Sequence, residues 1–324
     1  MSTSLESRLV SLDRIRAAAE RIRGVATRTP LLRWDDTTWL KPESLQPVGA
    51  FKMRGAYNKL ASLTYAERAR GVVTYSSGNH AQAVARAARL LGSHAVICMP
   101  ENAPKVKVDG VRRDGAEIVF TGPDSEERHR RALQLVEERG LVMVEPYDDP
   151  EIIAGQATCG LEIVEDLPDV GSVVVPVSGG GLSAGVATAV KNLAPSAVVI
   201  GVEPELAADG KESLERGELV TWTAEQTGRT MCDGLRTNSL GPLPFEHLRA
   251  YMERIVTVNE DEIADAMRLL AVRARLVVEP SGAVGMAADL AGRVPADSRP
   301  RVIVISGGNV DPELYLRILG GASA

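Results

Sequence analysis

In SVVVPVSGGGLSAG (Ser172–Gly185), an apolar β-branched run passes directly into a glycine-rich turn and then into helix-compatible sequence. Such a run is typical of a buried strand, and the helix after it would form part of a βαβ unit. The glycines let backbone N–H groups approach an anion, and the helix N-terminus adds unpaired donors and the positive end of its dipole. The pattern indicates a site for a phosphate monoester. A tight turn that binds no ligand is the alternative.

The spacing within SGGGLSAG argues against larger phosphate ligands. It is not G-x-G-x-x-G, and the chain has no G-K-[ST] after a glycine-rich loop. A dinucleotide or a nucleoside triphosphate is therefore less favoured here than a simple phosphate.

Six similar apolar runs lie on either side of this stretch, with Ala- and Arg-rich helical segments between them. They are Val72–Ser77, His94–Pro100, Ala116–Gly122, Leu141–Pro146, Ala197–Pro204 and Arg301–Asn309. Strands that alternate with helices predict an α/β fold with open parallel sheets. Two further glycine turns, SSGNHA (Ser76–Ala81) and SGGNVD (Ser306–Asp311), follow strands, and ligands bind at the carboxyl ends of parallel strands.

Composition excludes several classes of function. The chain has 324 residues, 44% of them hydrophobic and 25% charged, which indicates a globular protein large enough for two domains. Its formal net charge is −6, its basic residues are dispersed and only 4% of residues are aromatic, so nucleic acid is not an expected partner. The sequence has neither a signal-peptide pattern nor an apolar run of the ~20 residues that would span a membrane. We expect a cytoplasmic protein.

Cys98, Cys159 and Cys232 are odd in number and far apart in the sequence. This spacing favours three reduced thiols over a disulfide framework or a zinc site.

Lys52 is the first candidate catalytic residue. It stands between Phe51 and Met53 in PVGAFKMRGAYN. An apolar pocket lowers the pKa of a lysine, which frees the amine for Schiff-base chemistry. On these residues alone, a lysine whose charged end extends from a helix into solvent is the alternative.

Two polar loops offer other kinds of site. Ser77, Asn79 and His80 follow a predicted strand, where they could bind a carboxylate or phenolate, cap the next helix, or do both. Glu203 and Asp209 lie in the loop GVEPELAADGKES, where they could hold a hard cation together with backbone carbonyls. A solvated acidic loop is the alternative for this second pair.

Seven motifs in sequence order link these sites to a known family. They are KPESLQPVGAFKMRGA, SSGNHAQA, AGQAT, SGGGLSAG, GVEP, EPSGAVG and SGGNVD. Together they resemble the pyridoxal-phosphate enzymes of fold type II, most closely the threonine and serine dehydratases and serine racemase. The resemblance covers roughly Thr29 to Asp311. It implies a larger domain of residues 1–61 plus 149–324, a smaller domain of residues 62–148, the cofactor between them, and a homodimer.

The resemblance also implies roles for individual residues. Lys52 looks like the Schiff-base lysine and Ser77 like a second acid/base on the opposite face of the substrate. The expected cofactor contacts are Phe51, Lys52, Asn79, Gly179, Gly180, Gly181, Leu182 and Ser306. The expected substrate contacts are Ser76, Ser77, Asn79, His80 and Tyr147. Glu203, the carbonyl of Ala207 and Asp209 match the family's site for Mg²⁺ or another cation.

Ser306 bears on the type of reaction. As the partner of the pyridine nitrogen, a serine would not keep the ring protonated as an aspartate would, which favours expulsion of a β-leaving group over transamination. The resemblance therefore implies dehydration of a hydroxy amino acid such as L-serine or L-threonine. A serine racemase, a 3-hydroxyaspartate dehydratase and a non-catalytic phosphate-ligand binding protein are the alternatives.

The chain departs from the family pattern at two positions. Ala50 stands where a serine often precedes the Phe-Lys pair, so a hydroxyl is lost from the pocket. Tyr147 stands where animal serine racemases tend to have asparagine, and an aromatic residue there is more typical of dehydratases or of enzymes that act on 3-hydroxyaspartate.

Overall fold

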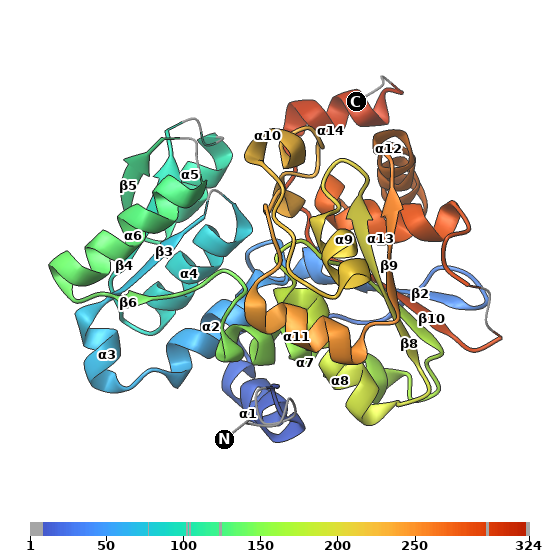
Figure 1. Cartoon of the computed structure of the whole chain (residues 1–324), viewed down its shortest axis with the longest axis horizontal. Coiled ribbons are helices and arrows are strands. Elements are labelled where there is room, and N and C mark those ends of the chain that lie inside the picture. The colour runs from blue at the N-terminus through green and yellow to red at the C-terminus, as the bar shows by residue number, and fades with distance from the viewer. Residues whose placement is uncertain are drawn as a thin grey trace.

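The computed structural model describes residues 9–76, 78–101, 103, 105–122, 125–295 and 298–321. Within these residues two β-sheets lie side by side (Figure 1). The six-stranded sheet has the order β1 (Leu32–Arg33), β2 (Thr38–Pro42), β10 (Arg301–Ile305), β7 (Ser172–Pro176), β8 (Val198–Pro204) and β9 (Arg254–Val258). The four-stranded sheet has the order β5 (Glu117–Thr121), β4 (Ala95–Pro100), β3 (Val72–Tyr75) and β6 (Val142–Met143).

The strand pairs of both sheets are parallel, apart from the antiparallel pair β1–β2 at one edge. The predicted α/β fold with open parallel sheets is therefore confirmed. We call the part built on the six-stranded sheet the large lobe and the part built on the four-stranded sheet the small lobe. All strands of the small lobe lie between residues 62 and 148, and the domain boundaries at these positions stay a prediction.

Helices cover both faces of the large-lobe sheet. Val173 and Val175 of β7 pack on one face with α1 (Leu12–Ile22), α7 (Pro150–Asp166), α8 (Gly181–Leu193) and α11 (Pro242–Tyr251). Val174 packs on the other face with α12 (Glu260–Leu269), α13 (Pro280–Leu290) and α14 (Pro312–Leu319). This alternation follows from the two-residue period of a strand. The lobe also contains η2 (Glu43–Leu45), α9 (Asp209–Arg216), α10 (Ala224–Thr227), η3 (Asp233–Leu235) and a π-helical turn (Leu270–Ala274).

The small-lobe sheet is covered in the same way. Ile97 of β4 packs toward α2 (Lys52–Ser62), α4 (Asn79–Leu90) and α5 (Lys105–Arg113), whereas Cys98 packs toward α6 (Ser125–Arg139). The short helix α3 (Tyr65–Arg70) connects α2 to β3. Because α2 packs against both α4 and α7, it joins the two lobes.

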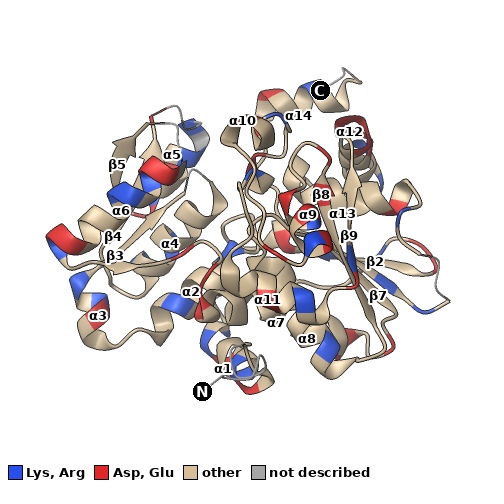
Figure 2. Cartoon of the chain, in the orientation of Figure 1, with Lys and Arg blue, Asp and Glu red and all other residues tan. Residues whose placement is uncertain are grey.

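The surface and the cysteines agree with the composition. Figure 2 shows Lys and Arg interspersed with Asp and Glu over the helices of both lobes. Cys98, Cys159 and Cys232 are buried and unpaired, as predicted. None of the helices in the described part of the chain has the length and apolar character that crossing a membrane would require.

The turn before α2 is held by backbone bonds to the end of β10. Phe51 N donates to the Ser306 carbonyl over 3.0 Å, and Gly308 N donates to the Gly49 carbonyl over 2.8 Å. Ala50 and Gly307 form an antiparallel bridge between these two bonds. The start of α2 is thus fixed to the centre of the large-lobe sheet.

A buried charge cluster anchors the first turns of α2. The Arg54 guanidinium donates to Glu43 over 2.7 Å and to Glu162 over 2.6 Å, and Lys41 also donates to Glu162 over 2.6 Å. Both cations are fully buried and are matched by two carboxylates, so neither charge is left unpaired. The cluster ties α2 to β2, η2 and α7.

Asp149 caps α7 and also binds α2. Its Oδ1 accepts from Glu151 N over 2.7 Å and from Ile152 N over 3.1 Å, and its Oδ2 accepts from Lys59 Nζ over 2.5 Å.

Asp149→Ala should lower the free energy of unfolding by about 1–2 kcal/mol, because two helical N–H groups lose their acceptor. Asp149→Asn, which keeps the cap but loses the ion pair, should lose less. Urea unfolding of the three proteins checks this, and equal losses for both variants would contradict it.

Candidate active site

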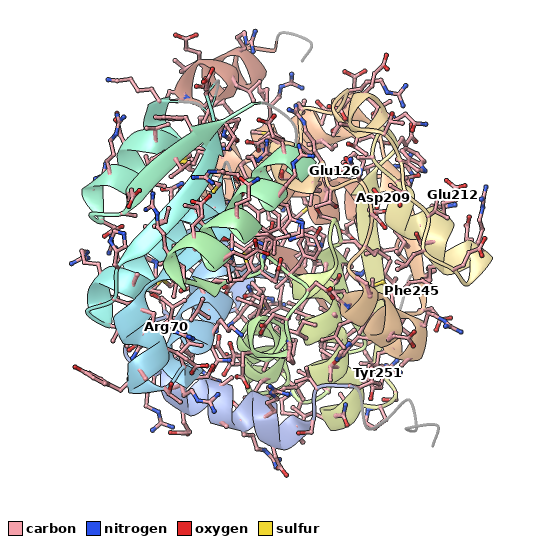
Figure 3. All side chains as sticks on the ribbon, turned by 60° about the vertical axis from the view of Figure 1, so that its left-hand side comes forward. Arg70, Glu126, Asp209, Glu212, Phe245 and Tyr251 are labelled. Atoms are coloured by element: carbon pink, nitrogen blue, oxygen red, sulfur yellow. The ribbon has the colours of Figure 1, made fainter. Side chains whose placement is uncertain are left out.

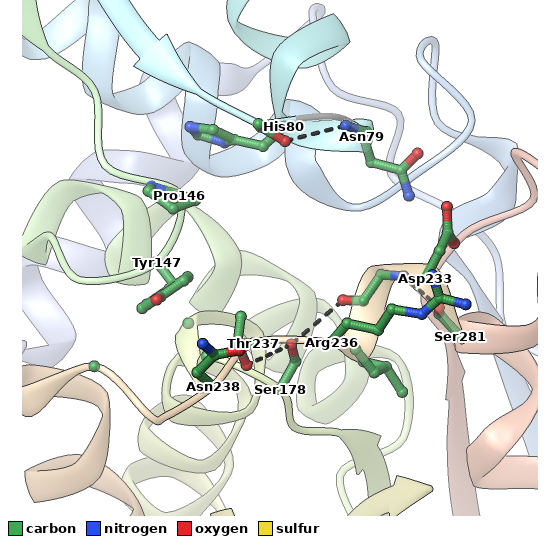
Figure 4. A pocket seen from close by; sticks show the side chains of 18 of the residues that line it. Asn79, His80, Pro146, Tyr147, Ser178, Asp233, Arg236, Thr237, Asn238 and Ser281 are labelled. Atoms are coloured by element: carbon green, nitrogen blue, oxygen red, sulfur yellow. Dashed lines mark hydrogen bonds between the residues drawn. The ribbon is translucent and has the colours of Figure 1, made fainter. Parts of the chain in front are cut away.

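A cavity of about 860 Å³ lies between the two lobes, at the carboxyl ends of β3, β7 and β10. Such a position is where open parallel sheets bind ligands, and the volume suits a small molecule. Figure 4 shows how side chains of both lobes surround it. The predicted residues that line it are Phe51, Lys52, Ser76, Asn79, His80, Tyr147, Gly179, Gly180, Gly181, Leu182 and Ser306. Ser77 lies outside the described residues.

Lys52 is the first residue of α2 and faces into this cavity. Its Nζ donates to the Pro146 carbonyl over 2.7 Å and lies 5.2 Å from the centre of the Phe51 ring. Burial lowers the pKa of Lys52 to about 8. Because its Nζ is hydrogen-bonded inside the cavity, the alternative of a lysine extended into solvent is wrong. The lowered pKa leaves more of the amine neutral and nucleophilic.

The glycine turn after β7 has a backbone conformation that suits anion binding. Ser178 has φ 58° and Gly180 has φ 90°, both in the left-handed region. The Ser178 hydroxyl donates to the Gly234 carbonyl over 3.3 Å and lies 3.1 Å from the Thr237 hydroxyl, which stabilises the unusual backbone (Figure 4). Gly180 is the N-cap of α8 and has no side chain to cap it. The N-terminus of a 13-residue helix thus opens on the cavity, as a phosphate site requires.

The same turn has no room for larger residues. A Cβ at Gly180 would lie 2.7 Å from Pro244 Cβ, and a Cβ at Gly179 would lie 2.4 Å from Tyr147 Cδ1. Tyr147, the predicted substrate contact, therefore lies directly against the glycine turn and covers part of it. Burial raises the pKa of its phenol to about 12, so the hydroxyl stays protonated.

The turn after β3 leads into α4, whose N-cap is Gly78. Asn79 is the first residue of the helix and not its cap, and Ser76 Oγ accepts from Gly78 N over 3.2 Å. The Asn79 amide donates to Glu279 over 2.7 Å and accepts from Asn309 over 2.8 Å. These two bonds orient the Asn79 side chain for a further contact in the cavity.

His80 and Ser306 are neutral polar groups of the cavity. Burial, followed by the nearby Lys52 charge, lowers the pKa of His80 to about 3, and His80 Nε2 lies 3.3 Å from the Val144 carbonyl. The buried Ser306 hydroxyl donates to the Ser281 carbonyl over 3.4 Å, which is a long bond. A serine hydroxyl has a single proton, so Ser306 would donate to a neutral ring nitrogen by exchanging this long bond for the new one.

Several cavity residues were not predicted. Glu279 is 2% exposed, and burial together with Asp233 raises its pKa to about 7. Lys107 of α5 forms an ion pair with Asp233 of η3 and so connects the two lobes beside the cavity. Glu145 follows β6 and accepts from Tyr75. Glu279 lies in the motif EPSGAVG, whereas nothing in the local sequence indicated a role for Lys107, Asp233, Glu145 or Tyr75.

Glu203 and Asp209 form a separate acidic pair, and neither residue lines the cavity. Glu203 is the last residue but one of β8, and Asp209 begins α9, as Figure 3 shows for Asp209. The two residues are 0% and 1% exposed, so the alternative of a solvated acidic loop is wrong. Glu203 Oε2 accepts from Lys211 N over 2.9 Å, but Glu203 Oε1 and both Asp209 oxygens are buried without a hydrogen-bond partner.

These carboxylates have an unfavourable environment without a cation. Burial raises the pKa of both, and the neighbouring Asp209 raises the pKa of Glu203 further. No further His, Cys, Asp or Glu of the described residues joins them in a metal-binding group. A cation here would need backbone oxygens as well, and the buried Ala207 between them in sequence has the expected carbonyl.

Comparison with known proteins gives a consistent result. Residues 22–307 match the family described as pyridoxal-phosphate dependent enzyme. The chain is 43% identical to an L-threonine ammonia-lyase of Thermotoga maritima, over 96% of this chain and 78% of that protein. It is 38% identical to an L-threo-3-hydroxyaspartate ammonia-lyase of Saccharomyces cerevisiae, over 94% of each. The structure of maize serine racemase superimposes with a TM-score of 0.89 at 36% identity, over 96% of this chain and 97% of the other.

Proposed function

The chain belongs to the pyridoxal-phosphate dependent enzymes of fold type II, and from this premise we propose that it dehydrates L-serine or L-threonine to a 2-oxo acid and ammonia. The observation that carries the proposal is the position of Lys52. Its amine, with a pKa near 8, shares one cavity with the glycine turn of α8. The similarity to an L-threonine ammonia-lyase supports this reaction.

The cavity residues fit the cofactor. The N-terminus of α8, with Gly179, Gly180, Gly181 and Leu182, would hold the phosphate. Asn79 would bind the phenolic oxygen, Ser306 the ring nitrogen, and Lys52 the aldehyde carbon, with Phe51 beside the ring. When bound, the cofactor supplies the electron sink for bonds broken at the substrate Cα.

The protein's own groups then have defined tasks. The N-terminus of α4, with Ser76, Asn79 and His80, would bind the substrate carboxylate through backbone and side-chain donors. Lys52 Nζ would take the Cα proton while the Cβ–O bond breaks, and the hydroxyl would leave as water after gaining a proton. The released enamine hydrolyses to the 2-oxo acid and ammonia. Ser77 stays the sequence-based candidate for an acid/base on the opposite face.

A divalent cation, Mg²⁺ or another, would bind Glu203, Asp209 and the carbonyl of Ala207. The support is the set of three carboxylate oxygens that are buried without partners. A hard cation would neutralise both charges and satisfy these oxygens. We also expect a homodimer in the cytoplasm, and light scattering of the purified holoenzyme tests the dimer.

A product assay tests the reaction. Holoenzyme incubated with L-serine and L-threonine should release pyruvate and 2-oxobutyrate with equal amounts of ammonia. Formation of D-serine without 2-oxo acid would instead show a racemase. Absence of any product, together with a cofactor spectrum that does not respond to amino acids, would leave only a ligand-binding role and refute the proposal.

A further inference from the structure

Tyr75, Glu145 and His129 form a cluster on the small-lobe wall of the cavity. The Tyr75 hydroxyl donates to Glu145 Oε2 over 2.8 Å, and His129 Nε2 lies 3.9 Å from Glu145 Oε1. The Tyr75 and His129 rings are 4.5 Å apart. Burial raises the pKa of Tyr75, so its hydroxyl remains a donor and fixes the Glu145 carboxylate as its acceptor. The Glu145 side chain is still 27% exposed, toward the cavity it lines.

The chain places this cluster beside the substrate position. Tyr75 immediately precedes Ser76, in the turn that would bind the substrate carboxylate. Glu145 immediately precedes Pro146, whose carbonyl holds the Lys52 amine at 2.7 Å. If the substrate carboxylate binds at the Ser76 turn and its amine lies near Lys52 Nζ, its Cα lies between these two positions. A substrate side chain that extends from this Cα toward the small-lobe wall passes the Tyr75–Glu145 pair.

Two carboxylates of this wall, Glu145 and Asp148, line the cavity together. Burial raises the pKa of Glu145, and the charge of Asp148 raises it further, so the two groups lie close enough to interact. The Lys107 ammonium on the same wall is already paired with Asp233 of the large lobe. A second carboxylate on the substrate would therefore approach two like charges.

We propose that Glu145, fixed by Tyr75, is a specificity-determining residue that makes the cavity select β-hydroxy amino acids with an uncharged side chain over 3-hydroxyaspartate. Like charges placed together reject the wrong ligand without improving contacts to the right one. The inference rests on the proposed function, and it resolves the choice among substrates that the motifs left open.

The test compares kcat/KM for L-threonine and L-threo-3-hydroxyaspartate in holoenzyme. Wild type should prefer L-threonine at least ~10-fold, and Glu145→Gln should shrink this preference by roughly 10- to 100-fold, as expected for removal of one like charge from a half-buried site. The glutamine is isosteric and still accepts from Tyr75, so folding should be retained. Glu138→Gln, on the exposed side of α6, removes the same charge away from the cavity and should leave the preference unchanged.

A binding measurement separates this inference from the proposed function. Binding of L-aspartate and of L-alanine can be followed by the visible absorbance of the cofactor. Glu145→Gln should bind L-aspartate more tightly than wild type does, and its affinity for L-alanine should stay unchanged. An L-threonine preference that stays within about threefold of wild type in Glu145→Gln, or a wild type that prefers 3-hydroxyaspartate, would overturn the role of Glu145. If no hydroxy amino acid is turned over, the proposed function fails, and the L-aspartate titration alone still judges Glu145.

Discussion

Lys52→Ala should abolish covalent cofactor binding and lower the turnover of L-threonine by at least ~10⁴-fold, because one amine both holds the cofactor and moves the Cα proton. The Pro146 carbonyl accepts from the Lys52 amine, and burial lowers the pKa of that amine. The other lysine in the described part of the cavity, Lys107, is paired with Asp233 and cannot take over this role. Loss of the visible absorbance band and of activity are the two measurements.

Borohydride reduction and peptide mapping give the direct control. The label should appear on the wild-type peptide that contains Lys52 and disappear in Lys52→Ala. Lys52→Arg keeps a positive charge but offers no amine for the linkage, so it should behave like the alanine variant. Lys191→Ala, remote from the cavity, should bind cofactor normally. A label that stays at wild-type level in Lys52→Ala would assign the cofactor to another lysine.

Removal of the cation should destabilise the protein more as the pH rises. The pKa values of Glu203 and Asp209 are raised in the folded state, so the folded state binds more protons than the unfolded one between the ordinary and the raised pKa. Without a cation, stability is full below the ordinary pKa and falls as the pH rises through the raised values. A pKa that is one pH unit higher in the folded state corresponds to a loss of about 1.4 kcal/mol. Chelated protein should therefore melt several degrees lower at pH 8 than at pH 6, and added Mg²⁺ should restore it.

Asp209→Asn gives this prediction an unusual control. The variant removes one of the two buried charges, so its metal-free form should be more stable at pH 8 than the metal-free wild type. The same change removes a ligand, so added Mg²⁺ should no longer raise its melting temperature. Equal melting temperatures for wild type and variant in chelator, or no response of wild type to any divalent ion, would contradict a cation at this pair.

Much of the fold could be predicted because central parallel strands are continuous apolar runs. β7, β8 and β10 begin within one residue of their predicted starts. β2 (Thr38–Pro42) was missed because it contains a lysine, which is buried only through its pairing with the distant Glu162. β9 (Arg254–Val258) was missed because it is a short, half-exposed edge strand. β6 was predicted as Leu141–Pro146, but only Val142–Met143 pair with β3 at the sheet edge.

Some residues of the site could also be predicted from the sequence, and others could not. Lys52, Asn79, Ser306 and the glycine turn stand in motifs that are visible in a short window, and the structure brings them together in one cavity. Tyr75–Glu145 and Lys107–Asp233 are pairs formed across 70 and 126 residues. Neither member of such a pair is unusual by itself, so only the folded chain shows them.

The attachment of the Lys52 turn to the end of β10 has a consequence during synthesis. Residues 49–51 leave the ribosome early, whereas their backbone partners 306–308 leave it late. At about 5–20 residues per second, the chain grows for roughly 10–50 s between these events. Throughout that time β2 lacks its parallel partner β10, and Lys52 lacks the backbone that fixes it. A nascent chain therefore cannot hold the cofactor productively, and the unpaired edge of β2 is open to misassembly until residue 308 emerges.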